Sequence, residues 1–209
     1  MAIFSPMVGF NRAGTTLLSS LLDAHPKIAF GNEIELVKRI TNRNVEFKES
    51  DFMRVVIPNV KSFTREGKKW TDRQYLLPIN YSYQDTTVYG DKKAAQSADI
   101  FGRNPAMIEK LYRLVTVDIK PLIIVRNPFD VIAAVFNRKD CMVALVKKGN
   151  TRTLDDVIQA HKPIIRGIET LLEKKPETQI IYYESLLSMT QTKISYILKY
   201  YGLSPDEQL

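Results

Sequence analysis

Side chains that can bind an anion follow the first apolar stretch of this 209-residue chain. Gly9 and Gly14 enclose a loop of the form G-x-x-x-x-G. The loop contains Arg12 and leads directly into Thr15 and Thr16. In such a loop successive backbone N–H groups point inward, and the N-terminus of the next helix adds partial positive charge. The main chain can therefore hold a phosphate or a sulfate.

The segments around this loop have the order that a phosphate loop requires. Residues 2–8 are mostly apolar and predict a strand, and residues 15–22 carry leucines at helical spacing. A nucleotide-hydrolysing loop would continue with lysine, but Thr15 stands there, and no neighbouring carboxylate suits a shared magnesium ion. The pattern favours a metal-free anion site, with a plain helix-capping turn as the alternative.

The stretch VGFNRAGTTLLSSLLDAHPKIAFGNE, residues 8–33, resembles the 5′-phosphosulfate loop of sulfotransferases that use 3′-phosphoadenosine 5′-phosphosulfate (PAPS). It is similar most of all to the tyrosylprotein branch, whose loop runs P-R-S-G-T-T before L-D-A-H-P and G-E-E. The pattern positions are filled by Arg12, Gly14, Thr15, Thr16, Asp23, Ala24, His25, Pro26, Gly31 and Glu33. Asn11, Ala13 and Asn32 depart from the pattern, and Ala13 removes a hydroxyl that could contact phosphate.

The resemblance assigns roles to these residues. It implies that the 5′-phosphosulfate is held by Arg12, Ala13, Gly14, Thr15 and Thr16. It also implies that Glu33 is the general base, because Glu33 falls on the position of the base in the tyrosylprotein relatives. Read alone, Glu33 would be a first-turn residue of a helix at 33–41, favoured there by the helix dipole. His25 is the rival base, although its D-A-H-P turn favours capping or packing.

A further cation follows a later strand. Residues 87–90 predict a short strand, and open α/β sheets place ligand groups at strand ends. The sequence GDK at 90–92 resembles the first half of the G-[DE]-K-[TS]-P element of sulfotransferases, while the following KA departs from its second half. The resemblance implies that Lys92 joins Arg12 in neutralising charge as the S–O bond breaks. A surface lysine is the alternative.

The second strong pattern is PLIIVRNPFDVIAAVFNR at 121–138. Residues 122–125 predict a central parallel strand, Arg126 stands at its carboxyl end, and the following Asn-Pro opens a helix. The pattern resembles the V-R-[ND]-P-x-D-V element of sulfotransferases, which implies that Arg126 binds the 3′-phosphate of the nucleotide. Ala134 replaces the helix serine of that element and so removes a hydroxyl.

The rest of the chain alternates helices and strands. Periodicity predicts helices at 105–115, 153–174 and 190–201 and a last strand at 179–183, with Gly202 as a helix C-cap. The sequence YYESLL resembles the V-x-Y-E-D-L element of sulfotransferases, which implies that Tyr183 lies by the adenine; a core tyrosine is the alternative. We expect His161 to be a packed or rim-exposed residue and not a catalytic one.

This alternation indicates an α/β fold, a P-loop-like parallel sheet with helices on both faces, as in sulfotransferases. With 44% hydrophobic residues the chain can bury one sizeable core. We expect a single nucleotide-binding domain over residues 1–209, with a less regular insertion of helix and loop at about 42–87. We expect the acceptor pocket in that insertion, with a solvated insertion that lines no cleft as the alternative.

The formal charge of +7 and pI near 9.4 suggest an anionic ligand or partner without choosing one. Cys141 is the single cysteine, so an internal disulfide and a cysteine metal cluster are excluded, which suits a reducing compartment. The N-terminal apolar run is too short to span a membrane. We expect a soluble cytoplasmic protein, with the Golgi lumen as the alternative if an N-terminal anchor was removed.

These patterns predict a PAPS-dependent sulfotransferase that needs no metal. Its acceptor would carry a hydroxyl, on a peptide tyrosine, a sugar or a small alcohol, and we do not expect a nucleic-acid partner. A kinase with a divergent phosphate loop is the enzyme alternative. A noncatalytic domain that binds a nucleotide or polyanion is the other, motivated by Ala134 and the short C-terminus.

Overall fold

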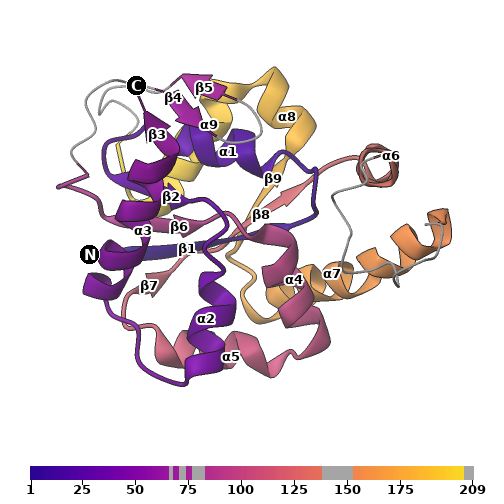
Figure 1. Ribbon diagram of the computed structural model, residues 1–209, viewed down its shortest axis with the longest axis horizontal. Coiled ribbons are helices and arrows are strands. Elements are labelled where there is room, and N and C mark those ends of the chain that lie inside the picture. Colours follow the sequence, from indigo (N-terminus) through magenta and orange to yellow (C-terminus); the bar gives the residue numbers. More distant parts are fainter. Residues whose placement is uncertain (66–67, 71–73, 77–82, 138–152, 205–209) are drawn as a thin grey trace.

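The computed structural model describes residues 1–65, 68–70, 74–76, 83–137 and 153–204. Cys141 lies outside the described residues. Within the described part, a six-stranded sheet has the order β2-β6-β1-β8-β9, with β7 also paired to β1 (Figure 1). Its strands are β1 (Ile3–Gly9), β2 (Ile28–Gly31), β6 (Val88–Asp91), β7 (Asp118–Ile119), β8 (Leu122–Val125) and β9 (Gln179–Tyr182). These pairings are all parallel, so the expected α/β fold class is confirmed.

Helices follow most of these strands. They are α1 (Thr15–Leu22), α2 (Leu36–Arg43), α3 (Glu49–Phe63), α4 (Ala94–Arg103), α5 (Ala106–Leu114), α6 (Pro128–Phe136), α7 (Leu154–Lys174), α8 (Tyr183–Ser188) and α9 (Thr190–Tyr201). Helix α4 is one that the sequence patterns did not predict. The patterns at 105–115, 153–174 and 190–201 correspond to α5, α7 and α9, and Gly202 ends α9 in the left-handed conformation.

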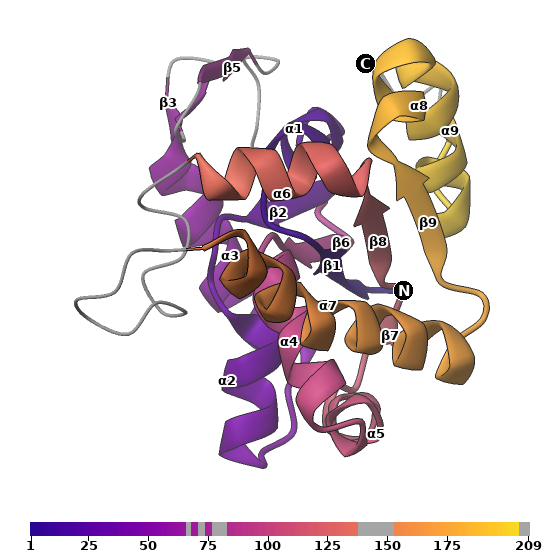
Figure 2. The same ribbon diagram turned by 90° about the vertical axis from the view of Figure 1, so that its right-hand side faces the viewer.

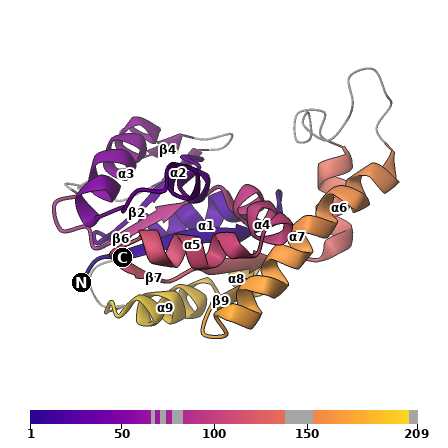
Figure 3. The same ribbon diagram turned by 90° about the horizontal axis from the view of Figure 1, so that it is seen from below.

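Alternate side chains of β1 face the two sides of the sheet. Phe4 and Val8 join a core cluster with residues of α2, α3, α4, α5 and α7, whereas Ile3 and Met7 join a cluster with α1, α8 and α9. Figure 3 shows α5 and α9 on opposite sides of the sheet. Because successive residues of a strand point to opposite faces, one apolar strand can hold both helical layers in place.

The segment 42–87 contains both helix and short strands. Helix α3 is part of the core, because Phe52 is fully buried and its ring stacks on Phe4 with centroids 4.7 Å apart. Three further strands form a small antiparallel sheet, β3 (Thr64–Arg65), β4 (Lys68–Trp70) and β5 (Gln74–Leu76).

Helix α6 lies beyond the carboxyl end of β8 and is held by its own small cluster. Val131 and Val135 of α6 pack on Val157 of α7, with Phe10 at the edge of the cluster. In Figure 1 the arrow of β8 points toward α6, and Figure 2 shows α6 and α7 side-on at this end of the sheet. Within the described residues, none of the helices combines the length and the apolar character needed to cross a bilayer.

Candidate active site

The loop between β1 and α1 has a backbone that requires glycine. Gly14 has φ of 92°, in the left-handed region, and Arg12 shares that region with φ of 67°. A Cβ on Gly9 would lie 2.3 Å from the carbonyl oxygen of Ile124, so β8 passes too close for any other residue. Ala13 is fully buried in the core, and its N–H donates to the Phe10 carbonyl at 3.4 Å. The side chain of Ala13 therefore faces the core.

Helix α1 begins at this loop without a side-chain cap among the described residues. The first N–H groups of an α-helix have no intrahelical partner, and they carry the positive end of the helix dipole. The N–H groups of Thr15 and Thr16 are in this first turn. The start of α1 therefore offers several donors to an anion.

Lys92 joins the phosphate loop to Glu33. Its Nζ donates to Thr16 Oγ1 at 3.0 Å and lies 3.6 Å from Glu33 Oε1, and its side chain is only 8% exposed. The sheet explains this meeting, because β6 pairs with β1 on one side and with β2 on the other. The segments that follow these three strands therefore leave the same edge side by side.

Glu33 stands in a turn before α2. The helix predicted from residue 33 begins instead at Leu36, so the expected first-turn position of Glu33 is wrong. Its φ is 55°, and its half-exposed carboxylate accepts a hydrogen bond from Lys93 Nζ at 2.8 Å. Partial burial opposes ionisation, but the Lys93 hydrogen bond and the charges of Lys92 and Lys93 hold the pKa of Glu33 below its ordinary value.

His25 stabilises the turn that leads into β2. Its ring is 1% exposed, and Nδ1 accepts a hydrogen bond from the Lys27 N–H at 3.2 Å. The buried carboxylate of Asp23 accepts the Phe30 N–H at 2.5 Å. His25 is therefore packed in the turn, which is one of the two structural roles expected for it. His161 is likewise buried, with Nδ1 2.6 Å from the Val157 carbonyl oxygen.

Arg126 lies against the other side of the loop. Its guanidinium donates to the Arg12 carbonyl at 3.1 Å and lies 4.7 Å from the centre of the Tyr183 ring. The Tyr183 ring in turn covers Gly14, because a Cβ there would lie 2.3 Å from it. The Nε of Arg126 is buried and has no hydrogen-bond partner among the described residues. A buried donor without a partner is costly, and an anion would satisfy it.

The family is decided by the match to known proteins. Residues 6–207 match the model of the Sulfotransferase family. The chain belongs to this family. The family expected from the motifs is therefore confirmed. One stretch of 43 residues is 42% identical to protein-tyrosine sulfotransferase A of Caenorhabditis elegans, and it covers 21% of this chain but only 11% of that relative.

Solved structures are similar over nearly the whole chain. The sulfotransferase domain from the curacin biosynthetic pathway is 18% identical, with a TM-score of 0.62 over 97% of this chain and 74% of that one. The sulfotransferase domain of the Synechococcus PCC 7002 olefin synthase is 15% identical, with a TM-score of 0.58 over 98% of this chain and 74% of that one. At these identities the likeness establishes the sulfotransferase fold.

Sequence reasoning missed three contacts at the candidate active site. Glu184 Oε1 accepts the Asn127 N–H at 2.8 Å, which ties the start of α6 to the start of α8. Lys93 pairs with Glu33, and Asp91 holds the turn around it. A carboxylate directly before a lysine at the end of an apolar strand is the signal that could have identified Asp91.

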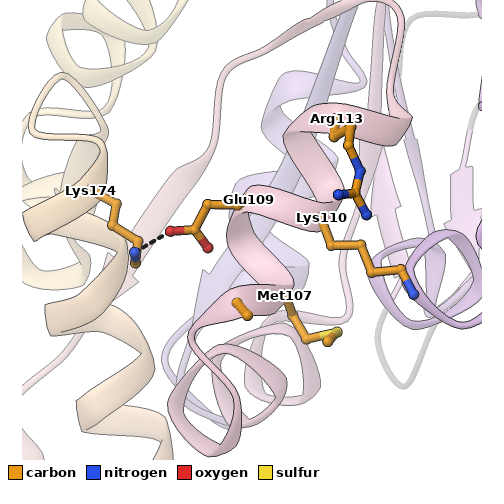
Figure 4. Close-up of a pocket in the computed structure, with 6 residues that line it drawn as sticks. Met107, Glu109, Lys110, Arg113 and Lys174 are labelled. Atoms are coloured by element: carbon orange, nitrogen blue, oxygen red, sulfur yellow. Dashed lines mark hydrogen bonds and ion pairs between the residues drawn. The ribbon is translucent and has the colours of Figure 1, made fainter.

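A shallow cavity of about 460 Å³ lies elsewhere, between α5 and α7 (Figure 4). Glu109 of α5 forms an ion pair with Lys174 at its edge, while Lys110 and Arg113 extend away from that pair. Helix α5 precedes β7 and the end of α7 precedes β9, so this cavity lies toward the amino edge of the sheet. It is therefore separate from the candidate active site, which lies at the carboxyl edge.

Proposed function

We propose that this sulfotransferase uses PAPS as the donor of a sulfuryl group and transfers that group to an acceptor hydroxyl, with Glu33 as the general base. The observation that carries the proposal is the position of Lys92. The Lys92 side chain is buried, and its Nζ contacts both the Thr16 hydroxyl at the phosphate loop and the Glu33 carboxylate. One cation therefore lies between the proposed donor site and the proposed base, where charge changes during transfer.

The residues around the loop fit a nucleotide with two phosphate positions. Arg12, Gly14, Thr15 and Thr16 would hold the 5′-phosphosulfate, with the first-turn amides of α1 as donors. Arg126 would hold the 3′-phosphate, which would supply the partner that its buried Nε lacks among the described residues. Tyr183, stacked between Arg126 and Gly14, would contact the adenine.

The bound donor supplies a sulfuryl group activated by its bond to phosphate. The acceptor oxygen forms a bond to sulfur while its proton passes to the Glu33 carboxylate. The S–O bond to the 5′-phosphate breaks, and its electron pair stays on the phosphate oxygen. Arg12 and Lys92 stabilise that developing charge. The Glu33 carboxylate is ionised at neutral pH and can accept the proton, and the lysine contacts that lower its pKa make it a weaker base until an acceptor hydroxyl replaces one of them.

The acceptor is proposed only as a hydroxyl compound, on a peptide tyrosine, a sugar or a small alcohol. The Glu33 side chain is 51% exposed, so the proposed base is open to solvent. Lys93 occupies Oε2 and is itself partly exposed, so an acceptor hydroxyl can take its place at that oxygen. Exchange of one donor for another at an exposed carboxylate has a small cost.

Calorimetry tests the donor site without knowledge of the acceptor. We expect 3′,5′-adenosine bisphosphate to bind in the presence of EDTA, and 5′-AMP to bind at least about 10-fold more weakly because it lacks the Arg126 contact. Preference for ATP with magnesium would support a kinase instead. Affinity that falls steeply with salt and ignores the 3′-phosphate would support a polyanion binder. Transfer from radiolabelled PAPS to a tyrosine peptide, a sugar and 4-nitrophenol would then identify the acceptor class.

A further inference from the structure

The carboxylate of Asp91 takes no part in the proposed transfer step, but it accepts two hydrogen bonds near Glu33. Asp91 ends β6, is 1% exposed, and lies directly before Lys92. Its Oδ1 accepts the Ile34 N–H at 3.1 Å, and its Oδ2 accepts the Leu36 N–H at 2.6 Å. Both N–H groups belong to the turn that follows Glu33 and leads into α2. One buried carboxylate therefore holds this turn at two points, on either side of Glu35.

This turn needs support from outside because its backbone is strained. Glu33 and Glu35 both have left-handed φ angles, 55° and 63°, which non-glycine residues seldom adopt. Such conformations persist where the surrounding structure fixes them. Helix α2 also begins without a cap from the Glu35 side chain, and Leu36 is its first residue. Asp91 therefore serves as the N-terminal carboxylate of α2 from a neighbouring strand.

The side chains of Asp91 and Lys92 point in opposite directions and make different contacts. Successive residues of an extended strand point in opposite directions. Asp91 points to the backbone of the Glu33 turn, while Lys92 points to Thr16 and to the Glu33 carboxylate. Asp91 thus fixes the turn, and the next residue, Lys92, provides a cation that contacts the Glu33 carboxylate.

We propose that Asp91 is the positioning residue for Glu33, holding the turn so that the Glu33 carboxylate lies against Lys92 and Lys93. The catalytic meaning of this inference rests on the proposed role of Glu33 as the base. Its structural content, the placement of Glu33, does not depend on that role.

The charge of Asp91 is sensitive to pH near neutrality. Burial raises the pKa of Asp91 to about 6, although the N–H groups of Leu36 and Ile34 and the charges of Lys93 and Arg39 oppose the rise. A protonated carboxyl group keeps one good acceptor oxygen in place of two. Acidification through pH 6 therefore weakens one of the two bonds that hold the turn.

The first experiment compares Asp91→Asn with Asp118→Asn, an exposed strand carboxylate that pairs with Lys120 away from the turn. In Asp91→Asn we expect amide exchange at Ile34 and Leu36 to accelerate at least about 10-fold. By carboxyl NMR, the pKa of Glu33 should rise toward its ordinary 4.5, as it loses the contacts with both lysines. Affinity for 3′,5′-adenosine bisphosphate should stay within about threefold. Unchanged exchange and an unchanged Glu33 titration would overturn the proposal.

The unmodified protein provides a second test if Asp91→Asn fails to fold. Between pH 7 and pH 5, protection of the Ile34 and Leu36 amides, corrected for intrinsic exchange, should fall relative to that of Leu18, whose N–H bonds to the Gly14 carbonyl at the start of α1. Equal behaviour of all three amides would contradict the proposal.

The positioning role and the base role can fail separately. If Glu33→Gln stays active while Asp91→Asn shifts the Glu33 titration, the positioning role stands and the base role falls. If Glu33→Gln is inactive while Asp91→Asn leaves the titration and exchange unchanged, the base role stands and the positioning role falls.

Discussion

The two halves of the candidate site are stabilised in different ways. The transfer half, where we propose that sulfuryl transfer occurs, consists of Arg12, Thr16, Glu33, Asp91 and Lys92. The nucleotide half consists of Arg126, Asn127, Tyr183 and Glu184. Buried groups fix the transfer half, where Lys92 is 8% exposed and Asp91 1%. In the nucleotide half Arg126 is 25% exposed and its partner Asp130 is 56% exposed.

This difference indicates which property each half controls. Buried charges with satisfied hydrogen bonds hold their geometry closely, and loss of one partner is costly. Exposed pairs contribute little to stability and are screened by salt. We therefore expect changes in the transfer half to alter turnover or folding. Changes in the nucleotide half should alter affinity, in a manner that depends on salt.

The largest effect is expected for Glu33→Gln. Loss of a positioned base should lower turnover at least about 10²-fold, with unchanged affinity for 3′,5′-adenosine bisphosphate, because the amide keeps the shape of the site. The matched control is Glu35→Gln, in the same turn and also at left-handed φ, whose carboxylate pairs with Lys38. Transfer assays with saturating PAPS measure both. A nearly fully active Glu33→Gln variant would contradict the role of Glu33 as the base, and with it the expectation that changes in the transfer half alter turnover.

The next effect concerns the stability of the transfer half and its dependence on pH. The pKa of Asp91 is raised from 3.8 to about 6 because its burial disfavours the charged form, so the folded protein is most stable below about pH 4 and loses free energy of unfolding as pH rises through 6. This global cost of ionisation is separate from the two local hydrogen bonds of the turn, which the ionised carboxylate accepts best. Relative to Asp91→Asn, the unmodified protein should lose on the order of 2 to 3 kcal/mol between pH 4 and pH 7. Urea unfolding of both proteins across this range measures the difference. If the free energies of unfolding of the two proteins changed in parallel with pH, the raised pKa of the buried Asp91 carboxyl group would be contradicted.

In the nucleotide half, Arg126→Ala should weaken binding of 3′,5′-adenosine bisphosphate by about 2 kcal/mol, roughly 30-fold. The loss for 5′-AMP should be much smaller but not zero, since Arg126 also donates to the Arg12 carbonyl of the phosphate loop. Arg126→Lys is the control that keeps the charge without the forked donors. Equal losses for the two nucleotides, measured by calorimetry, would show that Arg126 acts only through the loop.

The smallest effect is expected for Glu184→Gln. Glu184 is exposed, and its hydrogen bond to the Asn127 N–H can be made by the amide oxygen of glutamine. Bisphosphate affinity should therefore stay within about threefold at physiological salt. A loss of tenfold or more in calorimetry would mean that exposed contacts fix the nucleotide half as firmly as buried ones fix the transfer half.

Local patterns predicted the parts of the site that depend on neighbouring residues. The strand before Arg126, the proline at the start of α6 and the glycines of the phosphate loop follow from preferences that act over a few residues. The sequence also indicated the family, because the loop and the Arg126 element carry their residues in short contiguous motifs. These parts required no knowledge of which strands pair.

The tertiary structure decided how these motifs meet. Glu33 lies in a strained turn and not in a helix. The turn is held because the N–H groups of Ile34 and Leu36 donate to Asp91, which is more than fifty residues later in the chain. Lys92 reaches both Thr16 and Glu33 because β6 lies between β1 and β2 in the sheet. Arg126 braces the phosphate loop because β8 lies on the other side of β1. A propensity that acts over a few residues cannot specify such contacts, since strand order is set by the packing of the whole sheet between its two helical layers.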